Sequence, residues 1–473
     1  MSTAVSEINA EHLEVVRAWY DAKPDELNWA SRGYRAMLAH YYNLLIPADA
    51  SVLEVGCGSG GLLGRLHARR RVGIDLSAAQ VAKAREGCPD CEFHREAAEA
   101  LSLTERFDFI VISDTLNFAA DVQRILELLH HVTHPRTRLL LNYPSALWRP
   151  VLALARGLGI KPAEPASNWL ATSDIRGLLS LADWAPLVIQ PRILCPVHAL
   201  GLGPLINRWV APLFPWSCLT IFCVGRSLRH LETGPLTVSV VIPARNEAGN
   251  IEAAVRRTPE MGAGTELIFV EGNSRDNTWE EIERVARANP QRRIKTLKQP
   301  GKGKGDAVRA GFAVAEGDLF IILDADLTVP PEEMPKFYAA IASGRAEFAN
   351  GSRLVYPMEK AAMRFLNMCA NKTFGILFSR ILGQPLKDTL CGTKVLRRSD
   401  YERIAANRAY FGNFDPFGDF DLLFGAARLN LKIIDVPVRY RDRTYGSTNI
   451  HRWSHGWLLL RMVLFAARKL KFV

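Results

Sequence analysis

The chain has 473 residues, of which 48% are hydrophobic and 23% are charged. This composition is ordinary for a folded globular protein and the length exceeds what one domain usually carries, so we expect two domains of roughly 200–250 residues. The net charge of +10, from 59 basic and 49 acidic residues, favours anionic partners such as phosphate groups, acidic lipids or nucleic acid without choosing among them.

The opening residues, MSTAVSEINAEHLEVV, lack the basic segment and apolar core of a secretory signal. No stretch of about 18 residues has the uninterrupted apolar character of a spanning helix. The nearest, 196–224, contains Arg208 and four prolines. The eight cysteines show no disulfide framework. These features predict a cytoplasmic chain with reduced thiols.

A candidate nucleoside site begins where a short strand, Val52–Val55, runs into the glycine-rich turn 56–61 and a helical pattern follows. Glycines let such a turn tighten and let a ligand approach the backbone beside a helix N-terminus. The next strand, RVGID, ends at Asp75, 19 residues after Gly56. An acid at this separation in sequence typically accepts hydrogen bonds from ribose hydroxyls. The glycines also satisfy the dinucleotide pattern G-x-G-x-x-G, so an NAD(P)-binding domain is an alternative.

Glu54, two residues before the first glycine, suits a ligand that carries an amine better than it suits a pyrophosphate. Together with RFDFIVISDTLNF, HPRTRLLLNYP and CLTIFCVGRS, this acid-x-G-x-G-x-G motif resembles the class I S-adenosylmethionine-dependent methyltransferases over residues 40–228. The resemblance implies a Rossmann-like domain that binds S-adenosyl-L-methionine. The residues that it implies for the cofactor are Gly56, Gly58 and Gly60 at the methionine part, Glu54 near the amino group and Asp75 at the ribose.

The third-strand motif departs from that family. Where the family usually carries Asp-Ala this chain has Ala97-Ala98, so Glu96 or Glu99 would have to receive the adenine amino group. Two alternatives stay open for residues 1–230: an active methyltransferase, whose methyl acceptor the sequence does not name, or an inactive methyltransferase-like domain that docks the second half.

The domain boundary is predicted near residue 230, at the polar stretch LRHLETGP, which contains Gly234-Pro235. Both segments, 1–230 and 231–473, alternate strand and helix patterns. This alternation predicts an α/β chain of two Rossmann-like domains, each with a parallel sheet and helices on both faces.

In the second half, three consecutive strand patterns deliver polar side chains to their carboxyl ends, where open α/β sheets bind ligands. The third, DLFIILDADLTVPPEE, places Asp324 and Asp326 directly after a buried strand, Leu319–Leu323. Neighbouring carboxylates repel each other unless a cation lies between them, and residues i and i+2 share a face. A hard divalent ion, Mg²⁺ or Mn²⁺, that neutralises a diphosphate leaving group explains the pair.

Six segments resemble, in this order, the family-2 glycosyltransferases of the GT-A fold, in the dolichyl-phosphate mannosyltransferase-like branch: VVIPARNE, GKGKGDAVRAGF, DADLTVPPE, NGSRL, DTLCGTKVLRR and LNLKIIDVPVRYRDRTYGST. The resemblance covers residues 236–450. It implies metal-dependent, inverting transfer from a nucleotide-sugar to a polyprenyl phosphate or lipid-linked glycan. Asp326 and Asp324 would hold the metal, with Asp324 on the nucleotide side. The nucleotide would be lined by Pro243, Arg245, Glu247, Glu271 and Lys302, and substrate phosphates would face Arg353, Arg397 and Arg443.

Two departures concern the metal and the acceptor. Thr328 stands where the branch carries an amide metal ligand. Asp419 and Asp421, in GDFDLL, stand where other family-2 enzymes hold their general base. An alcohol acceptor needs such a base, whereas a phosphate acceptor is already ionised and needs none. Both aspartates are therefore candidate catalytic residues, and the acceptor stays open.

The C-terminal tail is apolar around Trp457 and Leu464 and closes with Arg468, Lys469 and Lys471. It is too short to span a bilayer and has the pattern of an amphipathic helix at a membrane surface, the alternative being a helix packed on the domain. We expect a bifunctional transferase of one glycan or glycolipid pathway, peripheral on the inner face of the membrane, with no nucleic-acid partner. The sugar, the nucleotide and the oligomeric state stay open.

Overall fold

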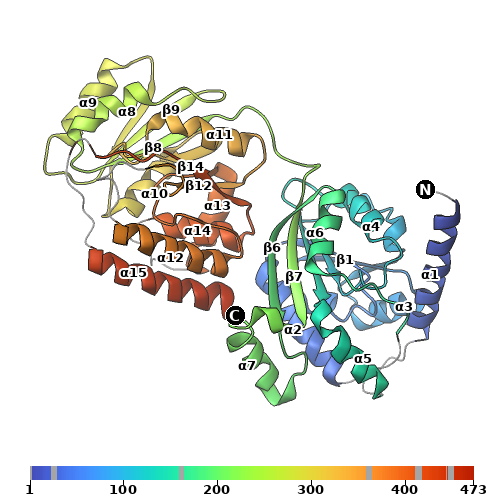
Figure 1. Cartoon of the computed structure of the whole chain (residues 1–473). Coiled ribbons are helices and arrows are strands. Elements are labelled where there is room, and N and C mark those ends of the chain that lie inside the picture. The colour runs from blue at the N-terminus through green and yellow to red at the C-terminus, as the bar shows by residue number, and fades with distance from the viewer. Residues whose placement is uncertain are drawn as a thin grey trace. The chain divides into compact units, whose positions relative to one another are not determined.

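The computed structural model describes residues 3–22, 29–158, 164–357, 365–410, 418–443, 445 and 452–473. The chain divides into two compact units, one formed by residues 1–231 with Phe472 and the other by residues 232–471 with Val473 (Figure 1). Each unit holds a seven-stranded sheet with helices packed against it. The α/β expectation is therefore confirmed for both halves.

The N-terminal unit orders its strands β3-β2-β1-β4-β5-β7-β6. These strands are β1 (Ser51–Val55), β2 (Arg70–Asp75), β3 (Glu92–Arg95), β4 (Phe109–Ser113), β5 (Arg138–Pro144), β6 (Trp184–Ile193) and β7 (Thr220–Ser227). Its α-helices are α1 (Thr3–Asp21), α2 (Trp29–Leu45), α3 (Ala78–Gly87), α4 (Val122–Leu128), α5 (Arg149–Gly157), α6 (Thr172–Leu181) and α7 (Leu202–Trp209).

Strand β1 lies at the point where the strand order reverses, with β2 on one side and β4 on the other, all parallel. Val52, Leu53 and Val55 are fully buried, because strands covered on both faces read as continuous apolar runs. The glycine-rich turn leaves the carboxyl end of β1 at this reversal, which is where open α/β sheets form a ligand-binding crevice.

The C-terminal unit orders its strands β10-β9-β8-β11-β13-β12-β14. They are β8 (Val238–Ala244), β9 (Thr265–Glu271), β10 (Arg293–Lys298), β11 (Leu319–Ile322), β12 (Phe348–Ser352), β13 (Lys394–Arg397) and β14 (Ile433–Pro437). Its α-helices are α8 (Ile251–Arg257), α9 (Thr278–Ala288), α10 (Lys304–Val314), α11 (Met334–Ala342), α12 (Phe365–Leu382), α13 (Arg398–Ala406), α14 (Asp419–Arg428) and α15 (Arg452–Ala466).

Strand alternation divides the C-terminal core between the two faces of the sheet. Val240 and Ile242 of β8 belong to one cluster, with Ile251 of α8 and Phe337 of α11. Val241 belongs to the opposite cluster, which includes residues of α10, α14 and α15. Both faces are apolar because helices cover both, so β8 and β11 read as unbroken hydrophobic runs.

The sheets, expected to be parallel, are mixed in both units. Strand β7 runs antiparallel to β5 and β6, and β13 runs antiparallel to β11 and β12. Large α/β sheets commonly include such strands. The reversal of β13 matters for the site, because it sends the carboxyl end of that strand to the edge opposite the carboxyl end of β11.

Helix α15 contains the predicted apolar tail. Leu459, Met462 and Val463 are buried in the C-terminal core, while Trp457 and Leu464 are 61% and 56% exposed. The helix thus packs on the domain with one face and presents another to solvent. Among the described helices, none combines the length and apolarity needed to cross a membrane.

Candidate active sites

The carboxyl ends of β8, β9 and β11 meet at one edge of the C-terminal sheet, because these strands are parallel neighbours. Pro243 lies in β8 close to this edge. Glu271 ends β9, is 4% exposed and accepts the Ser274 N–H. Asp324 and Asp326 follow β11. The strand ends therefore bring together the carboxylates that the sequence predicts there.

Asp324 pairs with Lys304, the first residue of α10, at 2.6 Å between Lys304 Nζ and Asp324 Oδ1. Burial opposes ionisation of this carboxyl, but Lys304 and Lys394 hold the pKa of Asp324 below its usual range. Gly392 lies directly against the pair, since a Cβ there would collide with the Asp324 carboxylate and with Lys304 Nζ. A larger residue at this position would displace the ion pair.

Asp326 has protein partners on both carboxylate oxygens. Its Oδ1 accepts the Thr328 backbone N–H at 3.1 Å and the Thr328 hydroxyl at 2.9 Å, which fixes the turn after β11. Its Oδ2 pairs with Arg443 Nη2 at 2.7 Å. Thr328, the residue at which the sequence departs from the usual amide, therefore orients Asp326 in this structure.

Arg443 also reaches Glu247, with 2.8 Å between Arg443 Nη1 and Glu247 Oε1. Glu247 is 7% exposed, and its pKa is raised because burial and the nearby Asp326 outweigh Arg443 and the Asn250 amide. One guanidinium thus lies between two carboxylates and offsets the repulsion between their negative charges. Glu247, Asp326 and Arg443 form one connected group.

Arg353 is at the predicted edge, but its guanidinium contacts Asp388. The two residues make a two-pronged ion pair, with Nε–Oδ2 at 2.7 Å and Nη2–Oδ1 at 2.9 Å. Burial opposes the charges, yet the pairing lowers the pKa of Asp388 to about 2. The Arg353 side chain is 11% exposed and stacks over Tyr440. It holds the loop before β13 and presents little of itself to a substrate.

Arg397 lies at the wrong edge for the predicted contact with substrate phosphates. It pairs with Leu319 at the amino end of β11, because β13 is antiparallel to β11. At about 3.3 Å per residue, five residues of strand separate that position from Asp324 by about 16 Å. Its guanidinium binds the Glu232 carbonyl oxygen at 2.6 Å. The assignment of Arg397 to the substrate site is therefore wrong.

For two of the predicted nucleotide-binding cations, the described residues include no ion-pair partner. Arg245, after β8, and Lys302, before α10, are both exposed. Lys304 is the lysine that reaches Asp324. The sequence GKGKG contains both lysines, and the signal that separates them is that Lys304 opens the helix, so its position is fixed by the first turn of α10.

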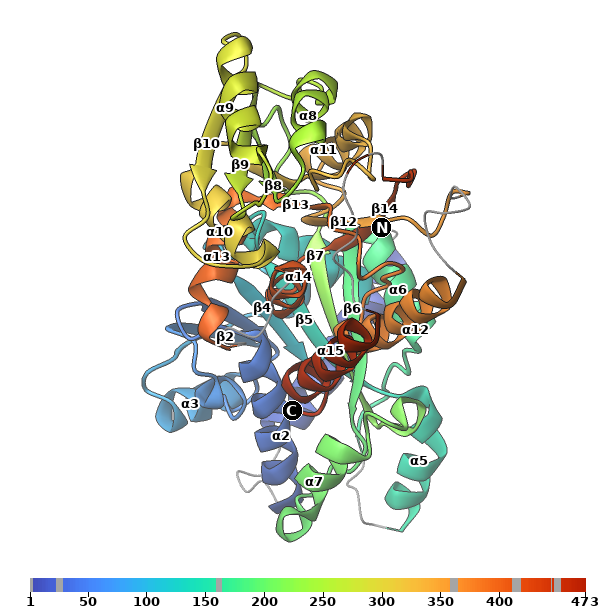
Figure 2. The same ribbon diagram turned by 90° about the vertical axis from the view of Figure 1, so that its left-hand side faces the viewer.

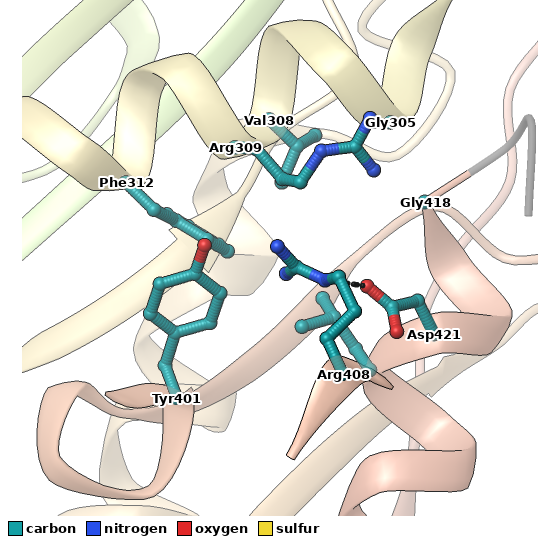
Figure 3. Close-up of a pocket in the computed structure, with 9 residues that line it drawn as sticks. Gly305, Val308, Arg309, Phe312, Tyr401, Arg408, Gly418 and Asp421 are labelled. Carbon is teal, nitrogen blue, oxygen red and sulfur yellow. Dashed lines mark hydrogen bonds and ion pairs between the residues drawn. The ribbon is translucent and has the colours of Figure 1, made fainter. Parts of the chain in front are cut away.

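Asp421 lines a pocket between α10 and α14 that includes neither Asp324 nor Asp326. Figure 3 shows the Arg408 side chain between Asp421 and the Tyr401 ring, and Arg408 Nε lies 2.8 Å from Asp421 Oδ2. Asp419 begins α14, and its side chain lies outside the described part of the chain. Asp421 is therefore engaged by an arginine in a pocket of its own.

The glycine turn of the N-terminal unit has the backbone that its sequence predicts. Gly56, Gly58 and Gly60 all have positive φ angles, 73°, 51° and 72°. At Gly56 and Gly60 an added Cβ would strike Thr115 and Phe93, whereas at Gly58 no atom of the described residues lies within 4 Å of it. The turn is thus packed at both ends and open at its middle, where a ligand can approach the backbone.

Asp75 organises this turn. Its Oδ2 accepts the Gly58 N–H at 2.7 Å and its Oδ1 accepts the Ser77 N–H at 2.9 Å. The carboxylate is 8% exposed. It joins the end of β2 to the turn after β1, so the residue that the sequence assigns to a ribose also fixes the glycine backbone.

Glu54 is buried beside the turn and is 3% exposed. Its Oε2 has no hydrogen-bond partner among the residues that the structure describes. Burial raises the pKa of Glu54 to about 8, and Arg35 opposes this only in part. A buried acceptor without a donor is costly, so this atom suits a ligand that carries an amine.

The two acids proposed to replace the missing adenine contact each hold a loop. Glu96 Oε1 accepts the Ser102 N–H, and Glu99 Oε1 accepts the Ala120 N–H at 3.0 Å. Both follow β3, and both are partly exposed. The structure thus gives each residue a structural partner and leaves the adenine contact as a prediction.

Comparison with known proteins finds a family match in each half of the chain. Residues 239–405 match the family model for glycosyl transferase family 2, and residues 52–136 match the family model for a methyltransferase domain. The latter match favours the methyltransferase interpretation over an NAD(P)-binding domain. It covers β1 to the end of α4 and the segment that follows, including the glycine turn.

Two curated relatives match less than half of this chain. A dolichol-phosphate mannosyltransferase from Pyrococcus furiosus is 31% identical over 222 residues, which are 46% of this chain and 59% of the relative. An undecaprenyl-phosphate 4-deoxy-4-formamido-L-arabinose transferase from Pseudomonas aeruginosa is 31% identical over 222 residues, which are 45% of this chain and 59% of the relative. The chain therefore spans 59% of the length of these relatives.

Two solved structures match parts of this chain. Glucosyl-3-phosphoglycerate synthase from Mycobacterium tuberculosis, in complex with Mn²⁺ and uridine diphosphate, is 20% identical with a TM-score of 0.37, covering 50% of this chain and 80% of that one. An S-adenosylmethionine-dependent methyltransferase from Mesorhizobium loti is 18% identical with a TM-score of 0.31, covering 40% and 97%. The chain is therefore similar to a methyltransferase domain over residues 52–136 and to glycosyl transferase family 2 over residues 239–405.

Proposed function

We propose that the C-terminal unit transfers a sugar, with inversion, from a nucleotide-diphosphate donor to a polyprenyl phosphate or another lipid-linked acceptor. The observation that carries this proposal is the group of two carboxylates and two cations after β11: Asp324 with Lys304, and Asp326 with Arg443. The matching relatives carry dolichol phosphate and undecaprenyl phosphate in their names, which supports this class of acceptor.

A divalent ion, Mg²⁺ or Mn²⁺, fits the donor set at Asp324 and Asp326. Their side chains are 31% and 16% exposed and offer the hard carboxylate oxygens that such ions prefer. Within the described ranges no cluster of three His, Cys, Asp or Glu side chains could hold a metal, so oxygens of the donor diphosphate would complete the coordination. When bound, the ion would neutralise the diphosphate leaving group as a Lewis acid.

Arg443 has to leave Asp326 Oδ2 before that oxygen can bind a metal, because it pairs with it at 2.7 Å. The released guanidinium can then face substrate phosphates, whose oxygens match its fork geometry. Lys304 keeps Asp324 ionised from the other side. This division of work assigns Asp326 to the metal and Asp324 to the nucleotide side of the site.

A phosphate acceptor fits the structure better than an alcohol. An alcohol acceptor needs a general base, and Asp421, the described candidate, pairs with Arg408 at 2.8 Å in a pocket apart from Asp324 and Asp326. A phosphate acceptor is already ionised and needs no base. Helix α15 supports a location at the membrane surface, since it exposes Trp457 and Leu464 beside a basic end.

The N-terminal unit is proposed to bind S-adenosyl-L-methionine and to methylate a compound of the same glycan or glycolipid pathway. The Oε2 of buried Glu54, which has no hydrogen-bond partner in the described part of the chain, suits the amino group, and the backbone at Gly58 suits the methionine part. When bound, the sulfonium supplies the methyl group. An inactive unit that docks the C-terminal unit is the second candidate, favoured by the absence of the third-strand Asp at Ala97-Ala98.

The test of the C-terminal proposal is a screen of nucleotide-sugars with polyprenyl phosphates and the full chain, with Mn²⁺, Mg²⁺ or a chelator. Asp326→Asn should abolish metal-dependent transfer. Asp318→Asn, at the amino end of β11, should retain it. Transfer by Asp326→Asn at the wild-type rate would exclude the metal role.

The N-terminal proposal is tested by titrating the full chain with S-adenosyl-L-methionine and with NADH. Binding of the first, weakened in Glu54→Gln, is expected. No binding at millimolar concentration would favour the docking role, and tight binding of NADH alone would overturn the cofactor assignment.

A further inference from the structure

Two short helices of the N-terminal unit turn their apolar faces to solvent. The exposed residues in and around α5 are Leu147, Val151, Leu154 and Leu158, at 67%, 50%, 64% and 65%. Those in α7 and the turn that follows are Leu202, Leu205, Trp209 and Trp216, at 61%, 56%, 47% and 71%. Leu147 to Leu158 and Leu202 to Trp209 recur at three- and four-residue steps, the spacing of one helical face, which a surface helix ordinarily buries, and Trp216 follows in the next turn. We call these eight residues the α5–α7 surface.

Contacts on the inner face of helix α7 fix its apolar face toward solvent. Gly203 packs so closely that a Cβ would collide with the Val197 carbonyl oxygen. Asn207, 3% exposed, accepts the N–H groups of Leu194 and Cys195 at 2.9 and 2.8 Å and donates to the Cys195 carbonyl at 2.8 Å. Turning the leucines inward would break these three hydrogen bonds, so the outward apolar face is built into the fold.

The two helices belong to one end of the unit. Trp148 Nε1, immediately before α5, donates to the Ser217 carbonyl oxygen at 2.9 Å, immediately after Trp216. In Figures 1 and 2, α5 and α7 both lie at the lower end of the N-terminal unit. Monomeric proteins rarely expose apolar patches of more than a few hundred Å² without a binding function. We therefore interpret the α5–α7 surface as a binding site.

The charges around the α5–α7 surface identify that partner. Residues 128–163 and 184–231, which include both helices, contain no Asp or Glu. Arg149 and Arg208 are exposed there, and the Arg208 guanidinium lies 5.4 Å over the Trp209 ring. Apolar side chains, tryptophans and arginines without carboxylates are the composition of helices that lie in an anionic lipid interface. A second copy of the chain would place like charges face to face.

We propose that the α5–α7 surface binds the N-terminal unit to an anionic phospholipid membrane. The cations face the headgroups, the tryptophans lie at the interface, and the leucines enter the acyl boundary. The proposal is independent of both transferase assignments, since vesicle binding is measured without sugar donor or S-adenosyl-L-methionine.

The experiment is flotation of the full chain with vesicles of phosphatidylcholine alone or mixed with phosphatidylglycerol. We expect binding to the mixed vesicles that weakens with salt. The double variant Leu154→Glu/Leu205→Glu should bind at least about tenfold more weakly, because each carboxylate removes apolar burial and adds repulsion. Leu181→Glu is the matched control, a leucine 66% exposed at the end of α6 in the same unit, and should bind as the wild type does. Circular dichroism checks that each variant folds.

Three outcomes would overturn the proposal. The double variant could float with the vesicles as well as Leu181→Glu does. Leu464→Glu in α15 could by itself remove all binding. The wild type could ignore vesicles and instead self-associate in light scattering, with the double variant monomeric, which would assign the surface to a second copy. Loss of binding in the double variant with binding retained in Leu464→Glu supports it.

Discussion

Glu54 makes the pH dependence of stability a direct test of the N-terminal site. Its side chain is 3% exposed, and burial raises its pKa to about 8 from an ordinary value of 4.5. Between these values the native protein keeps a proton that the unfolded chain has released. The native state therefore binds more protons, and the free energy of unfolding falls as pH rises through this window.

The size of the effect follows from the same shift. One proton corresponds to about 1.4 kcal/mol per pH unit, so between about pH 5.5 and 7.5 the contribution of Glu54 falls by about 3 kcal/mol. Glu54→Gln is neutral at every pH and lacks this term. The difference in stability between Glu54→Gln and the wild type should therefore grow with pH across the window.

Urea unfolding of both proteins over a pH series measures this difference, and comparison of the two cancels the titration of histidines. A difference that stays constant with pH would refute the reasoning, since it would mean that Arg35 keeps Glu54 ionised. Saturating S-adenosyl-L-methionine should reduce the pH dependence of the wild type, because an ammonium beside Glu54 stabilises its ionised form. An unchanged slope would contradict the role proposed for the amino group.

Three further changes test the C-terminal unit. Gly392→Ala should lower sugar transfer by about a hundredfold, because the new Cβ displaces Asp324 and Lys304. The control is Gly456→Ala, whose Cβ meets no atom of the described residues within 4 Å, and equal transfer rates for the two variants would contradict the prediction. Arg353→Ala should destabilise the protein by about 3–5 kcal/mol by leaving the Asp388 carboxylate buried without its partner, as urea unfolding would measure. Arg397→Ala should leave the kinetic constants for donor and acceptor unchanged. A raised KM for either substrate would show that Arg397 does take part in substrate binding.

The sequence predicted the strand-end carboxylates well, because a buried strand followed by Asp324 and Asp326 leaves its polar residues at a known edge of the sheet. It failed at Arg397, because strand direction is set by tertiary pairing. The segment KVLRR reads alike whether its strand runs parallel or antiparallel to β11. Only the pairing of Leu319 with Arg397 decides which edge the arginine reaches.

Side-chain partners between distant segments were also beyond sequence reasoning. Lys304 and Lys302 lie in one glycine turn, and the choice between them depends on the start of α10. The outward face of α7 escaped detection for a similar reason. A leucine stripe normally predicts burial, and the features that invert it are Gly203 and Asn207, whose partners Val197 and Cys195 are set by the loop before the helix.

The paired aspartates are already compensated by cations of the protein itself. Lys304 lies 2.6 Å from Asp324 and Arg443 2.7 Å from Asp326, so the repulsion that suggested a metal is relieved without one. A divalent ion is therefore not needed for the fold of this edge. It has to compete with Arg443, and the competition is favourable only when donor phosphates arrive to receive the displaced guanidinium. Metal and donor should consequently bind together, each raising the affinity for the other.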